Sequence, residues 1–458
     1  MDREYSVAAT DRSVYDIAVI GDGAAAALVL LAAAESAPRC KLISIGPAAG
    51  PGAGLAYSTT DPAHLLNVVA ARMSAYADRP DDFLDFLRAQ HCPHQATDFV
   101  PRARYGAYLK ARVAAARSGR DWPHRRTTVE AVQRVGDTWQ LRGADGDDVC
   151  ARHIVLALGA PPQRVPAGVD PAAIASQRYV PEPWSWLNAN ADRPAPQRTL
   201  IIGGGLTAVD LVLSLAARRD DACIHVLARH AAWPGVHSAE LATAADPWCG
   251  AIDIPPLSCA LAELRRLSAK GADWRALIDA QRPYTAARWA RMSHGERQGF
   301  IRHALWLWQR ARHRMAPQVA QRLASLQAAG RLSITAARQI QVRAEDSGCR
   351  VLWQGKDSAD VQSLKVDLVL QATGVATLHD QHLPPLLGSL LSQGLARIDA
   401  LRWGLEVDDQ QRLIDAQGEV QPSVHVLGWL ARGSRFECTA IPEIREAARR
   451  IAERLAGD

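Results

Sequence analysis

Short apolar runs alternate with longer helix-like stretches along this chain, and two of these runs have the same surroundings. Tyr15–Ile20 and Thr199–Ile202 are each followed by a glycine-rich turn and then by a stretch rich in Ala, Leu and Val. A short, mostly apolar run bounded by turn residues is typical of a buried strand. Because strand, turn and helix follow one another twice, the pattern predicts parallel sheets with helices packed on them.

The two halves of the chain continue this plan in the same order. In the first half we expect further strands at Lys41–Ile45, Thr128–Val135, Thr138–Arg142 and Ile154–Leu158. In the second half we expect them at Cys223–Ala228, Ser333–Val342, Arg350–Trp353 and Leu368–Gln371. The last strand of each half runs into a glycine-containing turn, Ala157-Leu158-Gly159 or Ala372-Thr373-Gly374. A small residue there lets the backbone pass close to a bound nucleotide.

The repeated plan predicts an α/β fold with two Rossmann-like dinucleotide-binding domains, each a three-layer ββα unit, and a helical insert. We expect residues 1–190 and 375–458 to form the first domain, and residues 191–374 to form the second. The stretch Trp184–Pro196, which follows two further prolines, predicts the first crossing between the halves.

The two glycine-rich turns match the pattern of dinucleotide-binding fingerprints. The first reads Gly21-Asp22-Gly23-Ala24-Ala25-Ala26 and the second reads Gly203-Gly204-Gly205-Leu206-Thr207-Ala208. The glycines let backbone N–H groups approach a pyrophosphate, whose charge the N-terminus of the next helix stabilises. Two such turns predict two dinucleotides, a flavin and a nicotinamide coenzyme. The expected contacts are Gly21, Gly23 and Ala26 at the first turn and Gly203, Gly205 and Ala208 at the second.

The end of the second strand in each half selects the adenosine ribose, since an acid accepts from the 2′-hydroxyl and a base tolerates a 2′-phosphate. In the second half this strand ends in Ala228-Arg229-His230, so Arg229 favours NADPH over NADH. An ordinary exposed strand end is the alternative for Arg229. In the first half the strand ends in Ile45-Gly46-Pro47, where Gly46 has no side chain to hold a ribose. A backbone group, a water molecule or a more distant residue replaces the acid there, or FAD binds less tightly.

The insert, about residues 231–328, carries the candidate substrate-binding residues. Apolar spacing predicts helices at Ala260–Lys270 and Phe300–Arg314. The segment Arg282–Arg314 is rich in Arg, Trp and His and holds Glu296 as its one acid. We expect either a solvated helical face anchored by aromatic side chains, or a lid over an anionic or planar substrate. The substrate-binding candidates are Arg312, Arg314 and Trp306.

Composition and charge are those of an ordinary globular protein. Of the 458 residues, 48% are hydrophobic and 22% are charged, and the formal net charge is +5. This modest charge fits an anionic cofactor, and no nucleic-acid-binding motif accompanies it. No apolar run is long enough to cross a bilayer, and Met1–Ser13 is polar, so we expect neither a membrane partner nor a secretory signal. The eight cysteines form no CxxC pair, which disfavours a metal site or a dithiol reductase and fits a cytoplasmic protein.

Further segments carry a family resemblance. They are Gly50–Thr59, Asp61–Val68, Arg72–Ala75 and Glu437–Arg445. With the two turns, and in this order, they make the chain resemble a bacterial family of FAD/NAD(P)-binding proteins related to the two-dinucleotide flavin monooxygenases. A non-classical FAD-dependent urate hydroxylase belongs to that family and is similar to this chain in length and arrangement. Aspartate N-hydroxylating enzymes are more distant relatives.

The resemblance implies that the first turn binds FAD and the second binds NAD(P)H. It also implies that Asn67, Met73 and Ser74 lie near the isoalloxazine ring. Asn67 would then hydrogen-bond the ring edge and Met73 would pack on its face. A buried turn and a core methionine are the alternatives for these residues.

The resemblance also directs attention to the C-terminal helix. Pro442 suits the first turn of that helix, and Thr439 is a candidate N-cap, with or without a flavin role. Its N-terminus would stabilise negative charge on a reduced ring. Further expected FAD contacts are Thr373, Gly374, Thr439 and Pro442. The segment Val426–Trp429 lacks the acid that many flavoproteins carry after its glycine, Gly428.

These features predict a FAD-dependent, NAD(P)H-consuming monooxygenase that hydroxylates a small, anionic nitrogenous substrate with O₂. The specific expectation is conversion of urate to 5-hydroxyisourate in a flat pocket lined by arginines and aromatic rings. The alternatives are an amino-acid N-hydroxylase of the same family, an NADPH-dependent flavin reductase or quinone oxidoreductase, and a redox-sensing module without activity. Such oxygenation needs no protein nucleophile or metal, which suits a sequence without HExxH, GxSxG or clustered His and Cys.

Overall fold

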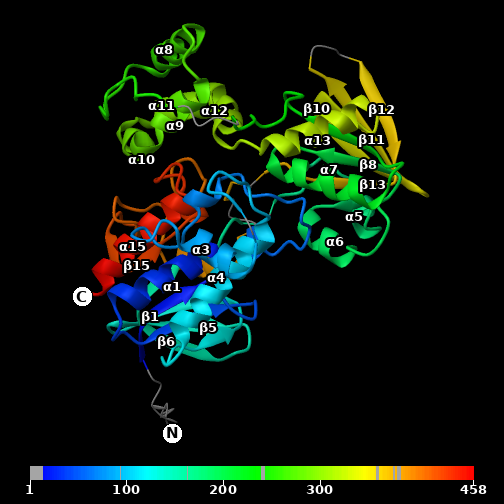
Figure 1. The fold of residues 1–458 in the computed structure, drawn as a ribbon. Helices are drawn as coiled ribbons and strands as arrows, with labels where there is room; N and C mark the ends of the chain where they lie inside the picture. Colours follow the sequence, from blue (N-terminus) through cyan, green and yellow to red (C-terminus); the bar gives the residue numbers. More distant parts are fainter. Residues whose placement is uncertain are drawn as a thin grey trace.

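The computed structural model describes residues 14–92, 94–161, 163–238, 243–356, 360–374, 377–378 and 383–457. Two β-sheets organise this part of the chain. An eight-stranded sheet is built from both ends of the chain and a seven-stranded sheet from its middle, as Figure 1 shows by the blue and red segments against the green and yellow ones. The predicted α/β fold is therefore confirmed.

The first sheet has the strand order β14-β15-β6-β1-β2-β3, and an antiparallel hairpin of β4 and β5 lies beside β6. Its strands are β1 (Val14–Ile20), β2 (Leu42–Gly46), β3 (His124–Arg126), β4 (Val129–Val135), β5 (Thr138–Gly143), β6 (Asp148–Leu156), β14 (Arg412–Ile414) and β15 (Val420–Val426). The central strands β15, β6, β1 and β2 run parallel. Parallel strands require crossover connections, which here bring the C-terminal strand beside the N-terminal ones.

Both faces of the first sheet are covered. The helices on one face are α1 (Ala24–Ser36), α4 (Arg102–Arg117) and α15 (Ile441–Leu455), and the other face carries the β4–β5 hairpin and α14 (Pro385–Ser392). Ile17 and Val19 of β1 point into the first layer, and Ala18 and Ile20 point into the second. Successive strand residues alternate between faces, so the part of β1 that is covered on both sides, Ile17–Ile20, is apolar throughout.

The second sheet has the strand order β12-β11-β10-β9-β8-β13-β7. Its strands are β7 (Tyr179–Val180), β8 (Arg198–Ile202), β9 (Cys223–Ala228), β10 (Leu332–Glu345), β11 (Gly348–Gly355), β12 (Val361–Val366) and β13 (Leu368–Gln371). The strands from β10 to β7 in this order pair in parallel, and β10, β11 and β12 form an antiparallel extension. The helices α7 (Leu206–Arg218) and α13 (Pro317–Ala328) cover one face, and α5 (Pro171–Ala175) packs on the other.

The remaining helices lie in the connections. They are α2 (Gly54–Tyr57), the 3₁₀ turn Ala70–Arg72, α3 (Asp82–Ala89), α6 (Pro183–Ala189) and the 3₁₀ turn Trp429–Ala431. The insert between β9 and α13 contains α8 (Leu257–Ala269), α9 (Trp274–Ala280), α10 (Arg282–Arg291), α11 (His294–His303) and α12 (Leu305–Arg312). In Figure 1 these insert helices stand above the red C-terminal segments.

The prediction of one helix over Phe300–Arg314 is wrong. The backbone leaves helical geometry at Ala304, where φ is −121° and ψ is −23°, and this separates α11 from α12. The break allows Phe300 and Trp308 to pack on the same ring, Phe436, from the two sides of the turn. Burial against a partner far away in the sequence therefore overrides the local periodicity.

The predicted first crossing at Trp184–Pro196 is also misplaced. The strand β7 ends before this stretch and already belongs to the second sheet, and Val169 already forms a bridge with Val342 of β10. The chain leaves the first sheet after β6, so the crossing follows Leu156 and precedes Val169. A first-domain boundary at residue 190 would assign β7 to the wrong sheet.

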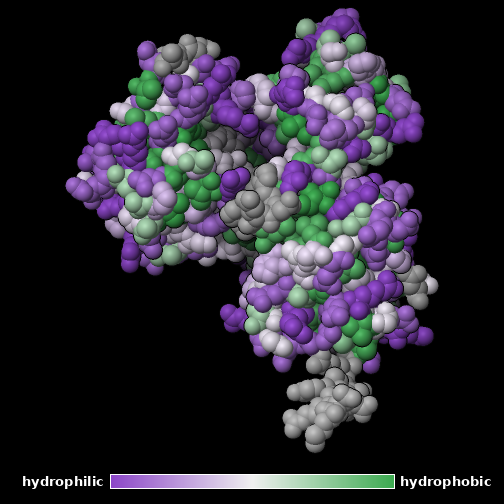
Figure 2. Space-filling view, turned by 180° about the vertical axis from the view of Figure 1, so that it is seen from behind, coloured by the Kyte–Doolittle hydropathy of each residue, from purple (hydrophilic) through white to green (hydrophobic). Residues whose placement is uncertain are grey.

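The molecule has three lobes when viewed from behind, and apolar side chains are visible where the lobes meet (Figure 2). Charged and polar side chains dominate the outer surfaces of the lobes in the same view. Among the helices that the structure describes, none has both the length and the apolar character that a membrane crossing requires.

Candidate functional site

The first fingerprint forms a tight turn between β1 and α1. Gly21 has a φ of +130°, and a Cβ atom there would lie 2.2 Å from the carbonyl oxygen of Ala157. Gly23 is the N-cap of α1, and no side chain caps this end of the helix. Ala26 is fully buried, so α1 approaches the sheet closely. The turn thus presents uncapped N–H groups at a helix N-terminus, which fits the phosphates of a dinucleotide.

The second fingerprint has the same geometry. Gly203 has a φ of +120°, and a Cβ atom there would lie 2.0 Å from the carbonyl oxygen of Ala372. The N-cap of α7, Gly205, has φ −84° and ψ −173°, against −82° and −173° for Gly23. Ala208 is fully buried, like its counterpart in the first half. Two turns with one geometry fit two ligands that share a pyrophosphate.

Thr373 and Gly374, which were expected at FAD, follow β13 beside the second turn. A Cβ atom at Gly203 would lie 3.1 Å from the backbone nitrogen of Thr373. The Thr373 hydroxyl donates to Gln163 at 3.2 Å. At the first turn Ala157 holds the place of Ala372, so the counterparts of Thr373 and Gly374 are Leu158 and Gly159. A contact of Thr373 or Gly374 with FAD remains a prediction.

Cations gather at the end of β9, where the sequence predicted the adenosine of NADPH. His230 stacks on Trp306 with ring centroids 4.1 Å apart. Burial and the nearby cations Arg229, Lys356 and Arg338 lower the pKa of His230. Within the part of the chain that the structure describes, no ion pair neutralises these three cations. The group is suited to a phosphate.

Sequence reasoning identified Arg229 and missed the other two cations. Arg338 lies on β10, which runs parallel to β9 with Ala336 opposite Ala228. Lys356 directly follows β11, whose Gly355 pairs with Ala337. The predicted strand at 333–342 could have pointed to Arg338, because neighbouring parallel strands end at the same edge of a sheet.

A buried polar joint connects the two halves of the protein. His64, which is 1% exposed, lies between Thr59 Oγ1 at 2.7 Å and Ser214 Oγ of α7 at 2.8 Å. The Ser214 hydroxyl donates to Asp61, and the Nε2 atom of His64 lies 3.1 Å from the carbonyl oxygen of Asp210. The joint attaches the segment before Asn67 to the helix that begins at the second fingerprint.

Asn67 lies at the contact between the halves. Its carbonyl oxygen lies 3.0 Å from Nε2 of His237, a residue at the start of the insert. Burial, with Arg314 nearby, lowers the pKa of His237 to about 4, so its ring is neutral near pH 7 and donates this bond. The side chain of Asn67 is half-buried. A flavin contact for Asn67 remains a prediction.

Met73 and Ser74 are held by the protein itself. Met73 is 1% exposed and packs in the core formed by α1, α4 and α15. The Ser74 hydroxyl donates to the carbonyl oxygen of Arg79 at 2.7 Å, and the Ser74 carbonyl accepts from Arg445 at 2.8 Å. The core methionine and the buried turn therefore account for both residues, and a flavin role for them remains a prediction.

The helix α15 begins at Ile441, and the prediction of Thr439 as its N-cap is wrong. The N-cap is Ala440, with φ −90° and ψ 154°, and no side chain caps this end. Thr439 lies one residue too early because the chain is still extended at Ala440. Pro442 occupies the first turn, where its missing N–H has no helical partner to lose.

The substrate candidates of the insert are engaged by other side chains. Arg312 is 5% exposed and lies 3.1 Å from Glu437, and Arg314 lies 2.6 Å from Asp279. Trp306 is the ring stacked on His230. Glu437 comes from the C-terminal segment and Asp279 from α9 of the insert, so counting acids only within residues 282–314 underestimated the number of ion pairs.

An aromatic cluster fastens the insert to the C-terminal segment of the first half. Trp289, Phe300 and Trp403 surround Phe436. The Trp289 indole donates to the carbonyl oxygen of Gly433 at 2.8 Å. These contacts favour the anchored-face interpretation of the insert, and they bring it next to the N-terminus of α15.

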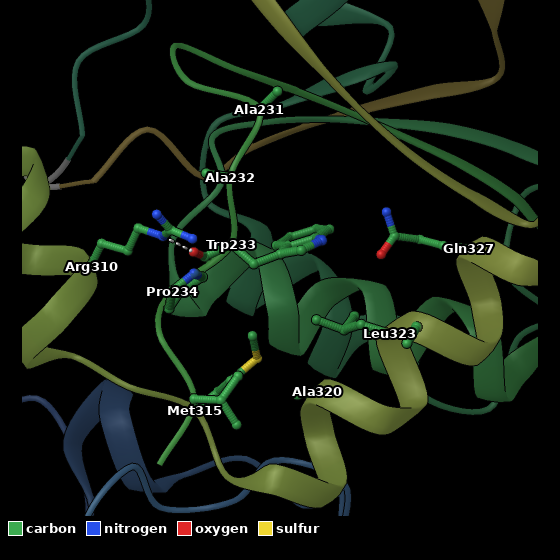
Figure 3. Close-up of a pocket in the computed structure, with 11 residues that line it drawn as sticks. Ala231, Ala232, Trp233, Pro234, Arg310, Met315, Ala320, Leu323 and Gln327 are labelled. Atoms are coloured by element: carbon green, nitrogen blue, oxygen red, sulfur yellow. Dashed lines mark hydrogen bonds between the residues drawn. The ribbon is translucent and has the colours of Figure 1, made fainter. Parts of the chain in front are cut away.

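A pocket of about 390 Å³ lies between α13 and the segment that follows β9 (Figure 3). Arg310 donates to the carbonyl oxygen of Trp233 at 3.0 Å across one end of the pocket, and Gln327 lies at the other end. Met315 and Leu323 make its wall largely apolar. None of the predicted substrate residues lines this pocket.

Among the residues that the structure describes, no group of three or more His, Cys, Asp or Glu side chains has a metal-binding arrangement.

Residues 18–161 match the model of a protein family described as FAD-NAD(P)-binding. The first fingerprint lies in this region. No curated protein sequence matches the chain.

Solved structures with the same fold align along almost the whole chain. The ornithine N-hydroxylase of Kutzneria sp. 744 has a TM-score of 0.69 and 17% identity over 97% of this chain and 99% of that one. The L-lysine 6-monooxygenase of Pseudomonas syringae has a TM-score of 0.64 and 19% identity over 96% and 99%. The bacillithiol disulfide reductase of Bacillus cereus has a TM-score of 0.58 and 13% identity over 97% and 99%. At these identities the likeness concerns the fold alone.

Proposed function

We propose that this protein is a FAD-dependent monooxygenase that uses NADPH and O₂ to hydroxylate an amino group of a small molecule, with amino acids as the first substrate class. The observation that carries the proposal is the pair of matching turns, since both N-caps, Gly23 and Gly205, have the same backbone conformation and no side-chain cap. The family match over residues 18–161 and the shared fold with ornithine and lysine hydroxylases support it.

Each half of the chain has a distinct part in this proposal. The turn at Gly21 binds the pyrophosphate of FAD and the turn at Gly203 binds that of NADPH. Bound FAD would supply the redox chemistry of the reaction, with NADPH as the source of electrons and O₂ as the source of the oxygen atom. Arg229, Arg338 and Lys356 bind the 2′-phosphate at the end of β9, which favours NADPH over NADH.

The contact between the halves positions the reacting groups. The polar joint around His64 holds the segment that carries Asn67 against α7, so the two nucleotides keep a fixed relation. The N-terminus of α15 would stabilise negative charge on the reduced flavin ring. The insert, packed through Trp289 and Phe436, excludes water from this junction.

The prediction of urate as the substrate required arginines and an aromatic ring that are free to bind a flat anion. Arg312 and Arg314 are paired with carboxylates, and Trp306 is stacked on His230. The fold neighbours named above include two amine hydroxylases. Amines are therefore the substrates to test first, and urate is the comparison.

The test is a substrate screen with three readouts. Purified protein is reconstituted with FAD, and NADPH oxidation, O₂ uptake and hydroxylamine formation are followed with L-ornithine, L-lysine, L-aspartate and urate. An amine that increases all three supports the proposal. Product from urate alone would shift the assignment to urate hydroxylation. NADPH oxidation that responds only to quinones or dyes would identify a reductase and overturn monooxygenation.

A further inference from the structure

The carboxylate of Asp22 occupies the space that the end of β2 leaves open. Gly46 ends this strand, and a Cβ atom there would lie 2.9 Å from Cβ of Asp22 and 3.1 Å from its Oδ2 atom. The backbone N–H of Ala48 donates to this Oδ2 atom at 2.7 Å. The side chain of Asp22 therefore lies where a side chain of the last β2 residue would project.

The second half has the reverse arrangement at equivalent positions. In the first half the backbone N–H of Gly21 donates to the carbonyl oxygen of Ile45 at 2.8 Å. In the second half that of Gly203 donates to the carbonyl oxygen of Leu227, also at 2.8 Å. Gly46 therefore corresponds to Ala228, the residue after Leu227. A Cβ atom at Gly204, the counterpart of Asp22, would lie 3.0 Å from Cβ of Ala228. Each half thus has room for one side chain between the turn and the strand end, and only the first half places an acid there.

The loop after β2 holds Asp22 in this position. The backbone N–H of Gly52 donates to the carbonyl oxygen of Asp22 at 3.0 Å. His124 donates to the carbonyl oxygen of Ala48 at 2.9 Å, and Arg126 donates to that of Pro47 at 3.2 Å. One carboxylate oxygen of Asp22 is engaged by Ala48, and the half-buried side chain keeps the other oxygen available as an acceptor.

We propose that Asp22 binds the adenosine ribose of the dinucleotide at the first turn, and that it makes this turn select FAD over NADPH. The inference rests on the proposed function, which puts FAD there. A carboxylate accepts hydrogen bonds from ribose hydroxyls and repels a 2′-phosphate. The turn at Gly203 has no acid at this place and has cations at the strand end, so the two turns take different dinucleotides.

The first experiment measures FAD affinity of the apo-protein by quenching of flavin fluorescence. Asp22→Asn removes the charge and keeps the size of the side chain. We expect the Kd for FAD to rise about 10- to 100-fold, the effect of losing hydrogen bonds to a charged group. Asp137→Asn is the matched control, because it removes the same charge from an exposed turn of the same half. Thermal unfolding of both variants reports whether they fold, and Asp22→Ser replaces Asp22→Asn if that variant does not.

A FAD analogue with 2′-deoxyadenosine separates a ribose contact from a purely structural one. Wild type should bind this analogue more weakly than FAD, and the difference should be smaller for Asp22→Asn, whose amide oxygen accepts only a neutral hydrogen bond. The double variant Asp22→Gly with Gly46→Asp should recover most of the FAD affinity, since the acid then projects from the strand end into the vacated space. Equal FAD affinity of wild type and Asp22→Asn would overturn the inference alone. Failure of wild type to bind FAD would overturn the proposed function as well.

Discussion

The guanidinium of Arg102 lies 2.9 Å from the carboxylate of Asp210, and this ion pair joins the two halves of the protein. Arg102 begins α4 on the first sheet, whereas Asp210 lies in the middle of α7 on the second. Both side chains are largely buried, and Arg102 also donates to the carbonyl oxygen of Leu65 at 3.1 Å. The pair lies next to the joint around His64, so charge and hydrogen bonds together fix the relation between the halves.

Arg102→Ala should therefore destabilise the protein strongly. It leaves the Asp210 carboxylate buried without its cation, and burial already raises the pKa of that group. We expect the free energy of unfolding to fall by about 3–5 kcal/mol, measured by urea denaturation. Arg104→Ala, an exposed change in the same helix, should alter it by less than about 0.5 kcal/mol. Equal effects of the two changes would show that the pair does not stabilise the contact.

The two turns should lose their ligands independently. Gly21→Ala puts a Cβ atom against the Ala157 carbonyl at a positive φ, and Gly203→Ala does the same at Ala372. We expect Gly21→Ala to purify without flavin, and Gly203→Ala to keep its flavin absorbance but resist reduction by NADPH. Gly50→Ala is the control, because a Cβ atom there meets no atom within 4 Å. Loss of flavin from Gly203→Ala, with Gly21→Ala still yellow, would reverse the assignment of the turns.

Coenzyme choice should depend on the cations at the end of β9. Arg229→Ala, Arg338→Ala and Lys356→Ala should each raise the KM for NADPH roughly tenfold, since a charge-assisted bond to the 2′-phosphate is lost. The KM for NADH should change little, because NADH has no phosphate there. Arg343→Ala, an exposed change further along β10, should leave both values unaltered. Parallel increases for the two coenzymes would remove the 2′-phosphate argument.

Acid should destabilise the first half through His425. This residue of β15 is fully buried, neither ring nitrogen has a partner among the described residues, and burial lowers its pKa to about 4. In the unfolded chain a histidine binds its proton near pH 6.5, so between about pH 6.5 and 4 the unfolded state holds more protons than the folded state. Stability is therefore unaffected above this window and falls as the pH falls through it, by up to roughly 3 kcal/mol.

His425→Leu supplies the measurement for this prediction. Unfolding free energies of wild type and variant are compared from pH 7.5 to 4.5. The difference between them should shift in favour of the variant as the pH falls, because Leu takes up no proton in either state. A difference that stays constant over this range would contradict neutral burial of His425.

The strands and turns were predictable from the sequence because their physical causes are local. β9 has the predicted bounds of Cys223–Ala228, because its run is apolar except at the half-buried His225, as a strand covered on both faces requires. The turn at Gly21 was predictable because only glycine tolerates its positive φ and its approach to Ala157. Local sequence also placed Arg229 at a strand end, and the structure adds Arg338 and Lys356 to the cations near His230.

The sequence by itself thus determined the two nucleotide turns, the parallel sheets and the helices that follow them. Only the tertiary structure decided what lies between those units: the break at Ala304, the carboxylates that occupy Arg312 and Arg314, and the place of Asp22 against Gly46. Backbone conformation and strand burial depend on neighbouring residues, so a sequence pattern records them. Ion pairs, ring stacks and shared space depend on residues that are distant in the chain, and the packing of the two halves and the insert is what brings these residues together.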